Sequence, residues 1–158
     1  MKTETTIFIM NERINKIRRK KTELTARKIL NQLTSIELIN FEEENSNWIK
    51  KFKAVLDQFH KIDSKPIDLI SLNKPREAYL KWIHKGFSFL LGKDEWLIVV
   101  PNCDEPIWAN VFVKDCHDAL VSVWDLAESK EFVIANKSSG QIAAVFSEEN
   151  GYEFHKGQ

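Results

Sequence analysis

The sequence EFVIANKSSGQIAAVF, residues 131–146, contains two short apolar runs on either side of a polar segment. The runs Glu131–Ala135 and Ile142–Phe146 include the β-branched and aromatic residues that are enriched in strands. The segment between them consists of turn-forming residues, and Gly140 can adopt the positive φ that such a turn needs. We therefore predict a β-hairpin with a loop of about four or five residues. An isolated hairpin is not stable in water, so further strands or a helix must pack against it.

Length and composition favour one globular domain without a membrane span. The chain has 158 residues, and a chain of this length buries roughly 68–70% of its unfolded surface without needing a disulfide or a metal. No apolar run reaches the roughly 18 residues of a membrane helix, and Ile7–Met10 is too short for the core of a signal peptide. We therefore expect a cytoplasmic protein in which Cys103 and Cys116 are reduced.

Positive and negative charges balance over the whole chain but not along it. There are 23 basic and 23 acidic residues, so no net charge attracts nucleic acid or an anionic membrane. Residues 13–28, however, carry eight basic residues and only Glu23 to oppose them. Ile14, Ile17 and Leu24 recur at helical spacing, which predicts a helix with an apolar side and a basic side. The apolar side continues in Ile29, Leu30 and Leu33. A phosphate-binding helix and a solvated helix face both fit this pattern.

Periodicity and turn signals predict the remaining elements, with Ser46 or Asn47 and then Asn73 as helix N-caps. These elements are a helix over 47–60, a strand over 67–70, a helix between Asn73 and Gly86, a hairpin of strands 87–91 and 96–100, a strand over 107–113 and a helix over 115–128. The strand over 96–100 is apolar throughout, which is typical of a central strand. The order indicates an α+β fold: N-terminal helices packed on a mostly antiparallel sheet, with one helix inserted before a C-terminal hairpin, in a single domain over 1–158.

Acidic residues and one tryptophan are the candidates for binding a partner protein. Trp108 follows an acidic loop, so it is the tryptophan that we expect to be partly exposed. An exposed aromatic side chain beside carboxylates is a plausible binding hot spot. The candidate residues are Asp104, Glu105, Trp108, Glu148 and Glu149.

The densest group of potential metal ligands is Asp115-Cys116-His117-Asp118. Adjacent residues of a helix point about 100° apart and cannot converge on one ion, whereas helix N-capping by Asp115 explains the group simply. A cleft lined by Cys103, Asp104 and His117 is an alternative, as part of a small enzyme or ligand-binding domain. The chain has no glycine-rich phosphate loop, GxSxG or HExxH motif, so we predict no catalytic residue, metal or cofactor.

The C-terminal half resembles the small immunity proteins of bacterial polymorphic-toxin and contact-dependent inhibition systems. The likeness rests on Trp96–Val100, the loop Pro101–Pro106, the helix after Lys114 and the hairpin over 131–146. It implies a protein without catalytic activity that neutralises a cognate toxin, for example a nuclease, by tight binding. Acidic loop residues would then steer the two proteins together. A nucleic-acid-binding accessory protein that uses the basic helix at Arg18–Lys21 is a further alternative.

Overall fold

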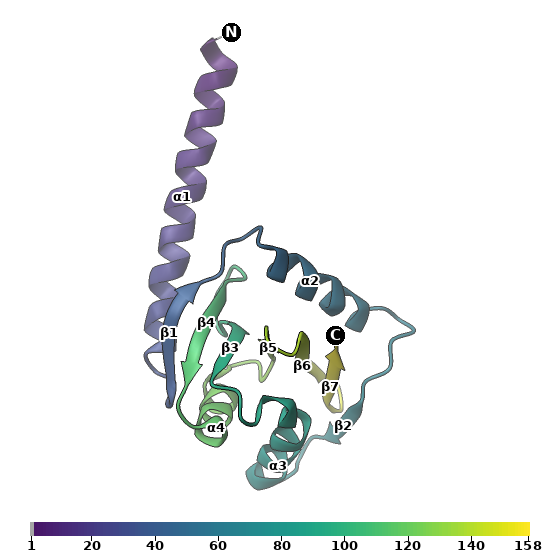
Figure 1. The fold of residues 1–158 in the computed structure, drawn as a ribbon. Coiled ribbons are helices and arrows are strands. Elements are labelled where there is room, and N and C mark those ends of the chain that lie inside the picture. Colours follow the sequence, from purple (N-terminus) through teal and green to yellow (C-terminus); the bar gives the residue numbers. More distant parts are fainter. Residues whose placement is uncertain (1) are drawn as a thin grey trace.

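The computed structural model describes residues 2–158, which form a seven-stranded antiparallel sheet with helices on both faces (Figure 1). The helices are α1 (Lys2–Leu30), α2 (Asn47–Phe59), α3 (Arg76–Gly86) and α4 (Cys116–Leu126), with a 3₁₀ turn, η1, at Ser88–Leu90. The strands are β1 (Ile36–Phe41), β2 (Asp68–Ser71), β3 (Glu95–Val99), β4 (Trp108–Val113), β5 (Phe132–Asn136), β6 (Gln141–Glu148) and β7 (Gly151–Gly157). Their order across the sheet is β1-β4-β3-β5-β6-β7-β2. The predicted α+β class is confirmed.

The predicted C-terminal hairpin is confirmed as β5 and β6. The two strands pair antiparallel from Phe132 opposite Val145 to Asn136 opposite Gln141. Gly140 has a φ of 71°, and its N–H donates to the Asn136 carbonyl at 2.9 Å. The turn therefore depends on a positive φ, a backbone conformation that residues with a Cβ adopt poorly.

The side chains of the sheet alternate between two apolar layers. Trp96 and Ile98 of β3 belong to the layer under α3, α4 and the last turns of α1, whereas Leu97 belongs to the layer under α2. In the second layer Leu97 packs with Phe52 of α2. The predicted central strand is confirmed, because β3 lies between β4 and β5 and is apolar on both faces.

The segment 87–91 is not a strand, so the second predicted hairpin is wrong. Phe87 and Leu90 are both fully buried, and this spacing of three suits the 3₁₀ turn η1 rather than one face of a strand. β3 pairs instead with β4 and β5. The predicted N-cap at Asn73 is also wrong: the N-cap position of α3 is Pro75, and Asn73 has a φ of 65° in the preceding turn.

Two strands were not predicted from the sequence, namely β1 at one edge of the sheet and β7. β7 pairs with β6 from Gly151 opposite Glu148 to Gly157 opposite Ile142. Its residues alternate, so Phe154 enters the layer under α3 and His155 is buried on the other face. The His155 Nε2 lies 3.1 Å from the Glu153 carboxylate. β7 also pairs with β2, the strand predicted over 67–70, from Asp68 opposite Phe154 to Ser71 opposite Gly151, and β2 forms the other edge of the sheet.

Candidate functional site

Trp108 is not partly exposed, and this correction removes it from the candidate partner-binding residues. It lies in β4 with 3% of its surface exposed, and its ring stacks on Phe52 of α2 at a centroid distance of 6.4 Å. The alternation along β4 explains the error: Trp108 points to the same face as Leu97 and Ile142, where α2 covers it. A side chain inside this layer cannot contact a partner.

The four candidate carboxylates lie at two separate places. Asp104 and Glu105 line a groove against α1, and Glu148 and Glu149 line another cavity beside β2. All four residues are exposed, and the two cavities share no lining residue. The sequence therefore identified exposed carboxylates correctly, but they do not form one acidic surface.

Cys103 and His117 do not share a cavity. The side chain of Asn102 donates to the Leu126 carbonyl at 2.9 Å, so Cys103 lies near the C-terminal end of α4, whereas His117 is in its first turn. The nine residues from His117 to Leu126 span about 14 Å of helix. Burial, and then the charge of Asp104, raise the pKa of the Cys103 thiol, which is the opposite of what a nucleophile needs.

Asp115 caps α4 as predicted, because its carboxylate accepts the Asp118 N–H at 2.9 Å. His117 stacks on His84 of α3 with ring centroids 4.1 Å apart. Among residues 2–158, no three His, Cys, Asp or Glu side chains lie close enough together to hold a metal ion.

The largest exposed feature is α1, whose N-terminal half projects away from the sheet (Figure 1). Every residue from 3 to 18 is exposed. The first half-buried residue is Arg19, which donates to the Glu42 carbonyl of the body at 2.8 Å and lies 3.3 Å from the Glu23 carboxylate in the next turn of α1. Further along, Ala26 is buried in the core. The helix is thus fixed at one end only, and residues 3–17 extend it by about 22 Å.

The apolar residues of α1 fall into a buried set and an exposed set, although the sequence suggested one continuous side. Ile29 and Leu30 are buried against the sheet, and so is Leu33 just beyond the helix. Seven large apolar side chains are between 46% and 63% exposed: Ile7, Phe8, Ile9, Met10, Ile14, Ile17 and Leu24. The six exposed residues from Ile7 to Ile17 lie on the half of the helix that projects from the body, whereas Leu24 lies on the attached half, on the side of the helix that the body does not cover.

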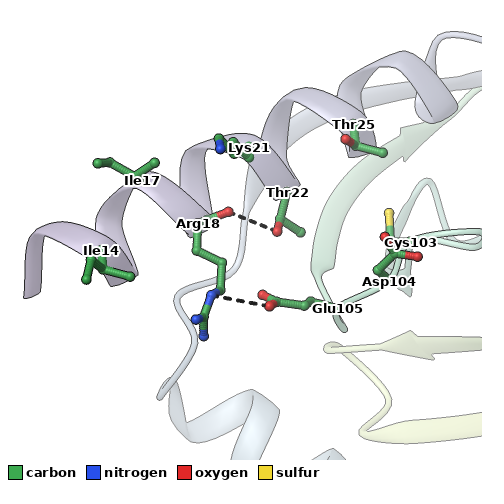
Figure 2. A pocket seen from close by; sticks show the side chains of 9 residues that line it. All are labelled: Ile14, Ile17, Arg18, Lys21, Thr22, Thr25, Cys103, Asp104 and Glu105. Carbon is green, nitrogen blue, oxygen red and sulfur yellow. Dashed lines mark hydrogen bonds and ion pairs between the residues drawn. The ribbon is translucent and has the colours of Figure 1, made fainter. Parts of the chain in front are cut away.

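A groove of about 380 Å³ continues this exposed apolar surface onto the body (Figure 2). α1 forms one wall, with Ile14 and Ile17 at its outer end, and Cys103–Glu105 form the other wall. The Arg18 guanidinium bridges the walls, with its Nε 3.5 Å from the Glu105 carboxylate. We call α1 from Ile7 to Leu24, together with this groove, the α1 surface.

The α1 surface is strongly basic. α1 contains nine Lys and Arg residues and three Glu residues, a net charge of +6, so the remaining residues carry −6 in this neutral chain. The basic stretch is visible in the sequence, but Ile7 and Met10 were not predicted to belong to its apolar side. Their spacing from Ile14 and Ile17, three or four residues each time, is the signal that connects them to the same stripe.

Within the described residues, no helix combines the length and apolar character needed to cross a membrane. Comparisons with protein-family models, with curated proteins and with solved structures found no match to this chain.

Proposed function

We propose that this chain is a binding protein that acts through the α1 surface, and that it serves as a cytoplasmic immunity protein without catalytic activity of its own. The observation that supports this proposal is the row of large apolar side chains on a helix that the body does not cover. Contiguous exposed apolar patches on globular proteins mark interaction sites. Residues 3–17 are all exposed, so packing on the body does not stabilise this part of the helix, and contact with a partner would do so.

The size of the helix indicates that the groove takes part. A projecting helix about 22 Å long and about 10 Å across offers roughly 350 Å² on one side. A stable interface needs about 800 Å² from each partner. The loop Cys103–Glu105 is the neighbouring surface that can supply part of the difference, because it forms the other wall of the groove. Two of the predicted residues, Asp104 and Glu105, thereby belong to the proposed interface.

The proposed partner is a toxin encoded beside this protein, a nuclease being one kind. Expressed alone, the neighbouring reading frame should arrest growth, and co-expression of this chain should restore growth and yield a stoichiometric complex by size-exclusion chromatography. The double variant Ile14→Asp/Ile17→Asp should lose the rescue with an unchanged unfolding midpoint, because both residues are exposed. The matched variant Glu148→Lys/Glu149→Lys should retain the rescue, because these residues line another cavity. A neighbour without toxicity, or rescue by the α1 variant, would contradict the proposal.

The charge of α1 supports a second candidate, a nucleic-acid-binding accessory protein. Basic residues such as Arg18 and Lys20 can neutralise phosphates, and binding would then weaken steeply with salt. Fluorescence anisotropy with a labelled oligonucleotide distinguishes the two candidates. Arg13→Gln/Lys20→Gln should reduce such binding, whereas Ile14→Gln/Ile17→Gln, which adds no charge, should leave it unchanged.

A further inference from the structure

The exposed stripe of α1 has the spacing of a coiled-coil seam. Residues 7, 10, 14, 17, 21 and 24 alternate in steps of three and four through three heptads. All except Lys21 are apolar, with Ile7 and Ile14 at the first core position and Met10, Ile17 and Leu24 at the second. This repeat is what allows two helices to pack along a continuous seam. All five apolar side chains are exposed, so no segment of residues 2–158 covers the seam.

The residues that flank the seam are basic. Arg13 and Lys20 lie on one side and Arg18 lies on the other, and Lys21 occupies a core position of the third heptad. No acidic side chain within residues 2–158 forms an ion pair with Arg13, Lys20 or Lys21. On the groove side the chain's own Glu105 already lies against Arg18. This ion pair shows that a carboxylate placed beside the seam can pair with a basic residue that flanks the seam.

We propose that the stripe of α1, as one part of the α1 surface, binds an acidic amphipathic helix of a partner protein, with the apolar positions of that helix against the stripe and its carboxylates against Arg13, Lys20 and Lys21. This inference rests on the proposed protein-binding function and specifies the structure and charge of the bound segment. Flanking charges of opposite sign determine which helices pair and in which orientation.

A second copy of this chain is a poor occupant of the seam. In a parallel pair Lys21 would face Lys21 of the other copy at a core position, and Arg13 would lie opposite Arg18. In an antiparallel pair the flank with Arg13 and Lys20 would lie against the same basic flank of the other copy. Each α1 carries a net charge of +6, so either arrangement brings like charges together.

An anionic membrane surface fits less well than a helix. Asp104 and Glu105 form the wall of the groove that continues the stripe, so a membrane lying along the stripe would meet these carboxylates. A partner helix can instead lie along the stripe on the side of Arg13 and Lys20, which leaves Asp104 and Glu105 to contact other parts of the partner protein. Phe8, the largest apolar side chain of the segment, also lies about 100° around the helix from Ile7 and outside the stripe.

The test uses the full chain and a synthetic peptide of three heptads, with Ile and Leu at the core positions and Glu at the flanking positions. Isothermal titration calorimetry should show one peptide bound per chain. A matched peptide with Lys at the flanks should bind at least about tenfold more weakly, because several ion pairs become repulsive. Amide hydrogen exchange of residues 3–17 should slow when the acidic peptide is added, because the bound helix no longer frays.

Two variants separate the apolar and the charged contributions. Ile14→Gln/Ile17→Gln, which removes apolar surface without adding charge, should abolish binding of the acidic peptide. Arg13→Glu/Lys20→Glu should reverse the preference, so that the Lys-flanked peptide binds more tightly. Both variants should keep the far-UV circular dichroism and unfolding midpoint of the body, because the four side chains are exposed. Reversal of the preference is the readout that a merely structural role of these residues would not produce.

Several results would overturn the inference. With the peptides, these results are equal binding of the two peptides or binding of neither. A second copy of the chain would be the occupant if the protein dimerised with concentration and Ile14→Asp/Ile17→Asp abolished the dimer. A membrane would be the occupant if the protein bound equimolar phosphatidylglycerol–phosphatidylcholine vesicles but not the acidic peptide. If neither peptide binds but toxin rescue still depends on Ile14 and Ile17, the helix inference fails and the proposed function stands. If rescue does not depend on these residues, the proposed function fails at this surface.

Discussion

The helices α1 and α2 carry similar apolar stripes but use them differently. In α2, Ile49 and Phe52 are buried against the sheet, and Trp48, Val55, Leu56 and Phe59 pack beside them. In α1, Ile14 and Ile17 follow the same kind of spacing, but about half of each side chain is exposed. Periodicity identifies the apolar side of a helix, whereas the path of the chain determines what covers that side.

This contrast separates stability from recognition. Burial of the α2 stripe removes apolar surface from water when the chain folds, so it contributes to the free energy of unfolding. The exposed part of the α1 stripe makes no such contribution until a partner covers it. Substitutions in α2 should therefore lower stability, and equivalent substitutions in α1 should leave the body unchanged.

The largest expected effect is that of Phe52→Ala in α2. Phe52 is fully buried, and its ring stacks on Trp48 at 5.7 Å and on Trp108 at 6.4 Å. Removing it should lower the free energy of unfolding by about 3–5 kcal/mol, through lost burial and the cavity left behind. Ile17→Ala in α1 should change this quantity by less than about 0.5 kcal/mol. Urea unfolding monitored by tryptophan fluorescence measures both, and similar effects from the two variants would mean that α1 packs on the body.

A smaller loss should follow from adding one methyl group under α2. A Cβ at Gly157 would lie 2.6 Å from Val55 Cγ1, so Gly157→Ala requires α2 or β7 to move. We expect a loss of about 1–2 kcal/mol from overpacking. Lys21→Leu enlarges the apolar stripe of α1 where the side chain is exposed, and it should leave the unfolding midpoint of the body unchanged. If thermal unfolding shows Gly157→Ala to be neutral, the contact between α2 and the sheet is looser than described.

The smallest effect concerns the attachment of α1. Arg19 donates to the Glu42 carbonyl at 2.8 Å and forms ion pairs with Glu23 and Glu44. Arg19→Gln should lower stability by about 1 kcal/mol at low salt and less at high salt, because the pair with exposed Glu44 is screened. Arg13→Gln, further out on the same helix, should have no measurable effect. Equal losses in the two variants would show that the projecting half is also attached to the body.

Most local elements were predictable because their signals lie within a few residues. The N-caps Ser46 and Asp115 both accept the N–H three residues on, and α2 and α4 begin where these caps predict. The β5–β6 hairpin follows from two apolar runs and a glycine with positive φ. β7 was missed because its apolar positions are few, and it is a strand mainly because β6 and β2 pair with it on both sides.

The candidate site was predictable only in its parts. The basic stretch of α1 and the acidic pair Asp104–Glu105 are visible in the sequence, but their contact joins segments 87 residues apart, as Arg18 and Glu105 show. Trp108 follows the same acidic loop and is nevertheless buried, because strand alternation directs it toward α2. Composition near a residue indicates a loop but not the face on which a side chain of the next strand will lie.

The sequence by itself determined the presence of the helices, the caps of α2 and α4, the central strand and the C-terminal hairpin of this protein, because these depend on local periodicity, capping and turn geometry. Only the tertiary structure decided the order of the strands, the burial of Trp108 and the exposure of Ile14 and Ile17. The physical reason is that burial depends on which distant segments meet. α2 lies against the sheet, which buries its apolar stripe. The part of α1 that precedes Arg19 projects from the body, so the stripe on this part is exposed to solvent.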